Sequence, residues 1–183
     1  MSRAEAIAQI TPIFRRYGYE GATLSRLSQA TGLGKASLYH YFPKGKEEMA
    51  AAVLEHTHQV FSEMVLKPLR TPAKPWERLE GMVQSLSQFY QQGEVSCLLA
   101  IFSAGAADDL FHPQVQRAVQ DWIQALSEVL MAAGLSSEVA DQNAQDAIIQ
   151  IQGALVLVRL LNDRAPFERV LRGLPDRLLD PGG

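Results

Sequence analysis

Apolar residues recur at intervals of three and four positions along most of this chain, which is the period of an amphipathic α-helix. Ile7, Ile10, Phe14 and Tyr17 form one such stripe near the N-terminus. No segment shows the sustained alternation of apolar and polar residues, rich in β-branched side chains, that predicts a strand. The pattern therefore predicts an all-α fold, with later helices at residues 46–66, 76–91, 95–105, 113–133, 138–162 and 166–172.

A glycine-bearing segment at residues 32–34 separates two short predicted helices. Gly18 and Gly21 end the first helix of the chain, Thr23 can cap the second, and residues 35–42 form the helix after the turn. Two short helices joined by a turn of this length are typical of a helix-turn-helix. The N-terminal three helices are therefore predicted to form such a domain.

The helix at residues 35–42 has polar and aromatic side chains on its outer face. Leu38 and Phe42 are four positions apart, so both can face the core. The other side chains can contact phosphates or base edges in a DNA major groove. They are Lys35, Ser37, Tyr39, His40 and Tyr41. The alternative is an ordinary amphipathic helix with an aromatic outer face.

Charge is divided unevenly along the 183 residues. The net charge of −3 by itself argues against a nucleic-acid partner. Residues 1–47, however, hold seven basic and three acidic side chains (+4), whereas residues 48–183 hold ten basic and seventeen acidic ones (−7). This asymmetry favours a DNA-binding domain at 1–47 and a larger domain at 48–183, although such a split also arises by chance. Because the acidic part repels phosphate, we expect weak nonspecific DNA binding.

Composition and motifs argue against other classes. The longest uncharged stretch, residues 95–107, is shorter than the roughly 20 residues of a membrane span. No apolar secretory segment follows Arg3, and the single Cys97 excludes an internal disulfide. We therefore expect a cytoplasmic protein with no membrane partner.

Nucleotide-binding and metal-binding motifs fail. Gly34-Lys35 lacks the earlier glycine and the following hydroxyl residue of a phosphate-binding loop, and Ser37 replaces the third glycine of a dinucleotide fingerprint. The Asp and His side chains at 108–112 could meet on one turn as metal ligands, or they could belong to a loop that ends at Pro113. We expect no metal, no cofactor and no enzymatic activity.

The segment from Tyr19 to Phe42 ends in Leu-Tyr-x-x-Phe and is followed by Lys46-Glu47. It resembles the DNA-binding segment of TetR-type transcriptional repressors. With the first helix, the resemblance covers about residues 3–55, and the rest matches by layout only. Leu27-Ser28 stands where the family often has Ile-Ala, and Gly34-Lys35-Ala36 where it has Ser-x-Gly, which removes a capping hydroxyl.

The resemblance implies a homodimer on a near-palindromic double-stranded operator, with one recognition helix in each half-site. It also implies a repressor that a small-molecule effector releases. By the same resemblance, the DNA backbone is held by Thr23, Tyr39, His40 and Lys46, and the bases lie nearest Lys35, Ala36, Ser37 and Tyr41. The alternatives are an activator or co-regulator without an effector, and a helical ligand-binding or enzyme-like domain.

Two apolar stripes offer a dimer interface, one at residues 113–133 and one at 138–162. Gly153 and Ala154 would let backbones approach, and two helices from each subunit would form a four-helix arrangement. The predicted interface residues are Val115, Val119, Trp122, Leu126, Val129, Ala144, Ile148, Ile151, Leu155 and Val158. The alternative is that both stripes form only the core of one subunit.

An effector pocket is expected where the resemblance places the ligand cavity. Methionine, aromatic and thiol side chains suit an adaptable apolar site. The candidates are Met64, Met82, Leu86, Phe89, Tyr90, Cys97, Ile101 and Phe102. Ligand binding would respace the two recognition helices through the helix at 46–66.

Overall fold

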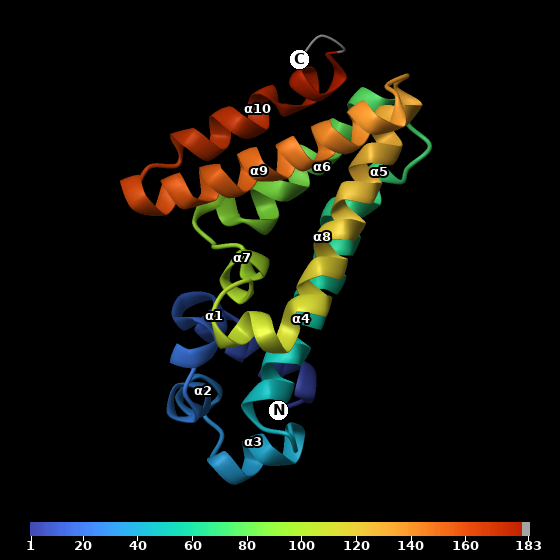
Figure 1. Ribbon diagram of the computed structural model, residues 1–183. Coiled ribbons are helices and arrows are strands. Elements are labelled where there is room, and N and C mark those ends of the chain that lie inside the picture. The colour runs from blue at the N-terminus through green and yellow to red at the C-terminus, as the bar shows by residue number, and fades with distance from the viewer. Residues whose placement is uncertain (181–183) are drawn as a thin grey trace. The chain divides into compact units, whose positions relative to one another are not determined.

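The computed structural model describes residues 1–180, most of them in helices (Figure 1). The helices are α1 (Arg3–Gly21), α2 (Leu24–Thr31), α3 (Lys35–Tyr41), α4 (Lys46–Phe61), the π-helix η1 (Ser62–Leu66), α5 (Lys67–Leu69), α6 (Pro75–Phe89), the 3-10 turn η2 (Gln91–Gly93), α7 (Leu98–Phe102), α8 (Ala106–Ala132), α9 (Ser137–Leu161) and α10 (Ala165–Leu179). No strand occurs among the described residues, so the all-α prediction is confirmed.

The start of α8 differs from the prediction. Residues 106–112 form its first two turns, and the helix continues through Pro113 instead of beginning there. Gly105 takes a φ of 61°, and the Ala106 N–H donates to Glu20 Oε1 at 3.0 Å. These two features begin the helix ahead of the proline. The Asp and His side chains of this segment consequently share one helix face, where His112 Nδ1 lies 3.0 Å from Asp108 Oδ1.

Two other helices also depart from their predicted lengths. The helix expected at 166–172 extends to Leu179, because Leu174 and Leu178 are buried on its inner face. The predicted tail at 178–183 therefore begins inside a helix, and residues 181–183 lie outside the described residues. The helix expected at 46–66 changes at Ser62 to the π-helix η1, in which the Lys67 N–H donates to the Ser62 carbonyl.

The chain forms two compact units. Unit 1 comprises residues 1–59 and 98–116, and unit 2 comprises residues 60–97 and 117–180. This division differs from the boundary expected at residue 47, because the segment 98–116 returns to the helix-turn-helix. The location of the DNA-binding function within residues 1–47 stays a prediction.

Unit 1 has an aromatic core that joins α1 to α7 and the start of α8. The ring centroid of Phe102 lies 5.9 Å from that of Phe14 and 5.5 Å from that of Phe111. Tyr19 contacts Phe111 edge-on at 5.4 Å. Because Phe14 and Phe102 are fully buried, residues 98–116 are part of the hydrophobic core beneath the first helices.

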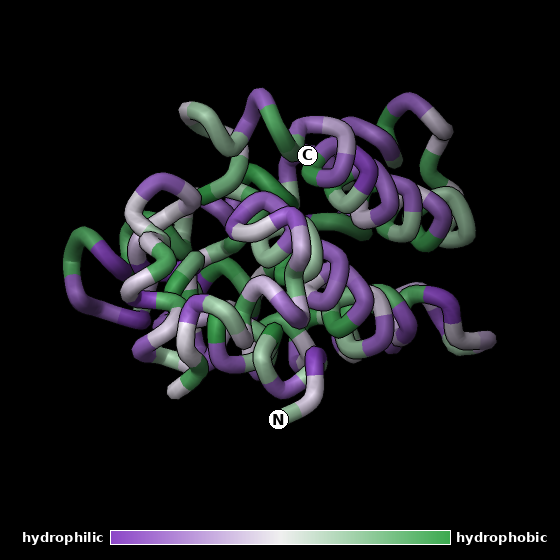
Figure 2. Tube along the Cα trace, turned by 90° about the horizontal axis from the view of Figure 1, so that it is seen from below, coloured by the Kyte–Doolittle hydropathy of each residue, from purple (hydrophilic) through white to green (hydrophobic). Residues whose placement is uncertain are grey.

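Unit 2 is built around α9 and α10, which pack along each other, while α10 also packs on α6. Ala144, Ile151 and Leu155 are among the buried residues of α9. By length and mean hydropathy (1.3) this helix could cross a membrane, but core helices pass the same test. In Figure 2, hydrophobic and hydrophilic residues alternate along the helical turns, as expected for amphipathic helices.

Candidate nucleic-acid interface

Side-chain hydrogen bonds fix the turn between α2 and α3. The hydroxyl of buried Thr31 donates to the Leu27 carbonyl at 2.9 Å and accepts the Leu33 N–H at 3.3 Å. The Ser28 hydroxyl donates to the Leu33 carbonyl. Gly32, with a φ of 66°, supplies the left-handed residue that ends α2. These contacts set the direction in which α3 leaves the turn.

The helix α3 has the two faces that its sequence predicts. Leu38 and Phe42 are fully buried, which confirms them as inward anchors. Its exposed residues are Lys35, Ala36, Ser37, Tyr39 and His40. Gly34 is the N-cap and offers no side-chain hydrogen bond. The exposed N-terminal turn of α3 therefore presents free backbone donors together with Lys35 and Ser37.

Tyr41 and Lys46, two other predicted DNA contacts, already have partners within the chain. Tyr41 is half-buried, and its hydroxyl donates to the Met1 carbonyl. The Lys46 ammonium donates to the Tyr19 carbonyl at 3.0 Å and lies 4.3 Å from the Tyr19 ring centroid. An ammonium has three hydrogens, so this bond orients Lys46 and leaves donors for a phosphate.

Tyr19, which orients Lys46, sits close to two acidic residues. Burial raises the pKa of the Tyr19 hydroxyl above its ordinary value, and the charges of Glu47 and Glu20 raise it further. The phenol therefore stays neutral at physiological pH, with its ring beside the Lys46 ammonium.

A cationic cluster at the start of α2 was not among the predicted contacts. Thr23 caps α2 by accepting the Arg26 N–H at 3.3 Å. The Arg26 guanidinium donates to the Gly21 carbonyl at 2.6 Å and lies 4.2 Å from the Tyr17 ring centroid. The Arg16 guanidinium lies 5.3 Å from the same centroid. A tyrosine and two arginines around a glycine-bearing turn are the sequence signal that could have identified it.

The N-terminus of α1 braces α3 and α4. Arg3 donates to the Tyr41 carbonyl at 3.3 Å, pairs with Glu48 at 3.3 Å and lies 5.0 Å from the Phe42 ring centroid. Ser2 and Glu5 form a capping box, in which the bond from the Ser2 backbone N–H lowers the pKa of Glu5. The first residues thus help to hold the end of α3.

Positive charge is local to this surface and is not a property of the whole unit. Residues 1–59 and 98–116 together contain seven basic and seven acidic side chains. All seven basic residues lie within residues 1–47. Charge complementarity to DNA is therefore confined to the first four helices.

Comparison with known families assigns both parts of the chain. The family model for bacterial regulatory proteins of the tetR family matches residues 7–53, and the model for the C-terminal domain of LmrA/YxaF-like transcriptional regulators matches residues 75–172. This chain belongs to the TetR family. It is therefore a DNA-binding transcriptional regulator with a helix-turn-helix, and the predicted resemblance is confirmed.

Relatives match the TetR-family chain over nearly its whole length. The regulator YxaF of Bacillus subtilis is 24% identical over 95% of this chain and 93% of its own, and LmrA of the same organism is 23% identical over 97% and 96%. A TetR regulator from Legionella pneumophila has a TM-score of 0.82 at 21% identity, covering 97% of each chain. Reduced NemR of E. coli has a TM-score of 0.77 at 22% identity, covering 95% of each. These structures share the fold.

Replacing Lys46 with alanine is expected to weaken binding to all DNA sequences alike, because a phosphate contact reads no base. The slope of log K against log salt should fall by about one per recognition helix. Titrations at several salt concentrations measure both quantities. Lys67→Ala is the matched control, since this exposed lysine lies in unit 2 and pairs with Glu63 at 3.0 Å. Unchanged affinity and slope for Lys46→Ala would refute the phosphate role.

Gly45→Ala is expected to lower both stability and operator affinity. Gly45 has a φ of 70°, and a Cβ there would lie 3.1 Å from Tyr39 Cε1. The left-handed backbone costs about 1–2 kcal/mol for alanine, and the contact pushes the exposed Tyr39 ring away from its position. Urea unfolding and operator titration measure the two effects.

Two other glycines separate backbone strain from crowding. Gly32 has a φ of 66° but free space around its Cβ position, so Gly32→Ala should lower stability with little change in operator affinity. Gly34 has an ordinary φ of −65° and free space, so Gly34→Ala should change stability least. Equal operator affinities for Gly45→Ala and Gly32→Ala would show that Tyr39 is not displaced or does not touch DNA.

The predicted dimer-interface residues are largely buried within one subunit. Nine of the ten are at most 9% exposed, and Val119 is half-buried. The nine are Val115, Trp122, Leu126, Val129, Ala144, Ile148, Ile151, Leu155 and Val158. A side chain that its own subunit already covers has almost no surface left to bury against a second one. This burial favours the alternative, the core of one subunit, and the assignment of these side chains to an interface stays a prediction.

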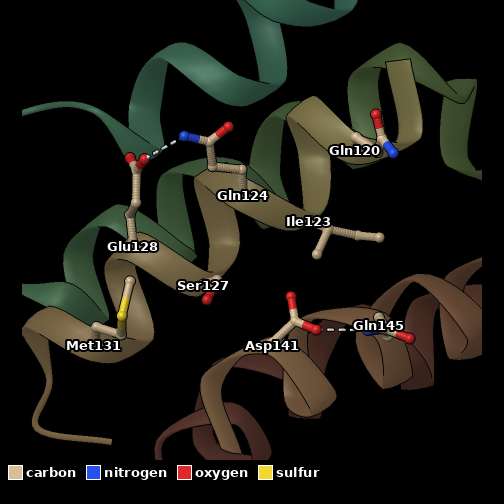
Figure 3. Close-up of a pocket in the computed structure, with 8 residues that line it drawn as sticks. All are labelled: Gln120, Ile123, Gln124, Ser127, Glu128, Met131, Asp141 and Gln145. Carbon is tan, nitrogen blue, oxygen red and sulfur yellow. Dashed lines mark hydrogen bonds between the residues drawn. The ribbon is translucent and has the colours of Figure 1, made fainter. Parts of the chain in front are cut away.

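The opposite face of α9 carries the exposed apolar residues. Ile149, Val156 and Leu160 are 66%, 46% and 74% exposed, and with exposed Gly153 they are spaced by four, three and four positions. Beside this stripe, a groove of about 540 Å³ runs between α8 and α9, with Gln124, Ile123 and Met131 on one side and Asp141 and Gln145 on the other (Figure 3). The groove is lined by polar and apolar groups alike.

The predicted effector residues are divided between the two units. Met82, Leu86, Tyr90 and Cys97 are buried in unit 2, Phe89 is half-buried there, and Met64 is 36% exposed. Ile101 and Phe102 belong to unit 1, where Phe102 is part of the aromatic core. The sequence of a short apolar helix such as α7 does not indicate which of the two units it packs into.

Proposed function

We propose that this TetR-family regulator is a cytoplasmic repressor that binds a near-palindromic operator as a homodimer. A small molecule bound in unit 2 releases it. The observation that carries the proposal is α3, whose two buried anchors hold an exposed face of lysine, serine, tyrosine and histidine. A helix placed this way after a rigid turn suits a major groove.

The division of labour within residues 1–47 follows from the chemistry of each side chain. Donors near helix starts suit phosphates, and the first turn of a recognition helix suits base edges. We assign the backbone to Thr23, Tyr39, His40 and Lys46, to which we add Arg26, and the bases to Lys35, Ala36, Ser37 and Tyr41. For the Tyr41 hydroxyl to donate to DNA, its hydrogen bond to the Met1 carbonyl must break first.

The exposed stripe of α9 supports the homodimer. Ile149, Val156 and Leu160 form one apolar row, and Gly153 in its middle permits close approach of a second helix. Two copies related by a two-fold axis bury the same row twice. Our proposed interface is therefore this exposed row of α9, with α8 beside it, and not the buried faces of the two helices.

The proposed effector site uses the unit 2 members of the predicted set. Met82, Leu86, Tyr90 and Cys97 supply apolar and polarisable surface, and Phe89 reaches the solvent boundary. Ligand binding there favours a spacing of the two recognition helices that does not fit the operator. By thermodynamic linkage, operator binding then lowers the affinity for the ligand by the same factor.

Selection of bound DNA from a random pool tests the proposal. We expect two inverted half-sites whose centres are about 10 base pairs apart or a multiple of that. A metabolite extract that raises the melting temperature should also weaken operator binding, and a reporter behind the selected site should fall when the protein is expressed. A single unpaired half-site would contradict the dimer, and a rising reporter would contradict repression.

A further inference from the structure

Gln114 has a buried hydrogen-bond acceptor without a partner. This residue lies on α8, in the part of the helix that belongs to unit 1. Its side-chain carbonyl oxygen, Oε1, is shielded from solvent and has no hydrogen-bond partner in the described chain. Buried polar atoms are nearly always paired, because an unpaired one loses its hydration without compensation. An acceptor in this state favours a ligand that donates a hydrogen bond.

Gln114 lines a groove of about 620 Å³. The other lining residues come from α1 and α4, so the whole groove belongs to unit 1. Ile7 of α1 and the neighbouring Ala51 and Ala52 of α4 give it apolar surface. Because the two alanines have no side chain beyond Cβ, they leave room for a narrow aliphatic chain along α4.

The charged groups of the groove are acidic on balance. Its titratable lining residues are Arg3, Glu48, Glu55 and His56. Arg3 pairs with Glu48 at 3.3 Å, so these two charges offset each other. With histidine neutral, the second carboxylate gives the lining one negative charge in excess. A cation is therefore favoured over an anion in this groove.

Glu55 can accept a ligand in addition to its contact within the chain. Its side chain is exposed, and its Oε1 accepts the Gln59 Nε2–H at 3.1 Å. An ionised carboxylate has about four acceptor positions, so this bond does not exhaust it. Hydrogen bonds from an ammonium to a carboxylate are stronger than those between neutral groups. Glu55 and Gln114 together favour a donor that is also positively charged.

We infer that this groove is a ligand site in the DNA-binding unit, and that it takes a primary alkylammonium cation. The ammonium donates to the Glu55 carboxylate and to Gln114 Oε1, which a rotation about the soft terminal torsion of glutamine turns toward the groove. The alkyl chain packs against Ile7 and the two alanines. The site is separate from the effector site proposed in unit 2. It adjoins Arg3, which donates to the Tyr41 carbonyl at the end of α3.

Three probes with the same four-carbon chain separate charge from hydrogen bonding. n-Butylammonium has a positive charge and N–H donors, n-butyltrimethylammonium has the charge without donors, and 1-butanol has a donor without charge. The readout is the side-chain amide resonance of Gln114 in the ¹⁵N-labelled full chain at constant ionic strength, identified by its loss in Gln114→Leu. We expect n-butylammonium to shift this resonance saturably and the other two probes to shift it much less. No shift with n-butylammonium, or an equal shift with either other probe, would overturn the inference.

Glu55→Gln removes the carboxylate charge and keeps the size of an exposed side chain, so the fold is not at risk. It should weaken n-butylammonium binding about tenfold, the effect of one charge-assisted hydrogen bond. Glu63→Gln is the matched control, because Glu63 is also exposed and bonded to the residue four positions on, Lys67, but belongs to unit 2. The control should bind the probe as the unchanged protein does. Equal affinities of the two variants would show that Glu55 does not hold the ammonium, and the inference would be wrong.

Discussion

Replacing Ile149 and Leu160 together with glutamate is expected to convert the protein from a dimer into a monomer of about 20.2 kDa. Both side chains are largely exposed in the subunit, at 66% and 74%, so the change costs the isolated fold little. In a two-fold dimer each occurs twice, and each contributes roughly 1.5 kcal/mol or more when fully buried. We expect the dissociation constant to rise by about 10³-fold or more. Sedimentation velocity at micromolar concentration measures it.

Leu110→Glu provides the matched control for this double substitution. Leu110 is a 44% exposed apolar residue of α8, but it belongs to unit 1, whereas the α9 row belongs to unit 2. The control protein should remain dimeric. Operator affinity should fall for the double variant only. In a dimer, binding of one subunit brings the second close to its half-site, and separate subunits lose this gain in effective concentration. A dimer that survives both glutamates would place the interface elsewhere.

The two faces of α3 could be predicted in detail because its sequence allows only one of them to pack against the core. Leu38 and Phe42 are the only large apolar pair on that helix with helical spacing, and a glycine-bearing turn fixes its start. The structure buries both residues and exposes Lys35 and Ser37 as expected. Local chemistry decides the fold of this segment, so local sequence reveals it.

The exposed apolar row of α9 could not be predicted because α9 is apolar on nearly every side. Ile148 and Ile149 are neighbours in sequence, yet one is 9% and the other 66% exposed. Periodicity identifies both faces as apolar but not which one the subunit itself covers. That choice depends on α10, which follows α9 in the sequence and packs back along it.

Contacts between residues far apart in the sequence explain why Phe102 lies in the aromatic core of unit 1. A five-residue apolar helix has no polar face to set its orientation, so the spacing of α7 cannot tell a ligand pocket from a core. Its partners, Phe14 and Tyr19, come from the first helix. The pairing depends on how residues 98–116 return to the N-terminal helices, which no local pattern encodes.

Phe102→Ala is therefore expected to destabilise the DNA-binding unit by about 3–5 kcal/mol, the usual cost of removing a fully buried phenylalanine. The cavity would lie against Phe14 and Tyr19, directly beneath the helix that orients Lys46. Urea unfolding should show the loss, and operator affinity should fall although Phe102 touches no DNA.

Leu99→Ala, in the same helix but only partly buried, is the control and should cost less. The same contacts predict that a fragment of residues 1–47 binds DNA more weakly than the full chain, even with every proposed contact present, because it lacks the 98–116 part of its core. A fragment that matched one full-length subunit on a half-site, or a Phe102→Ala protein as stable as Leu99→Ala, would show that this segment does not support the helix-turn-helix.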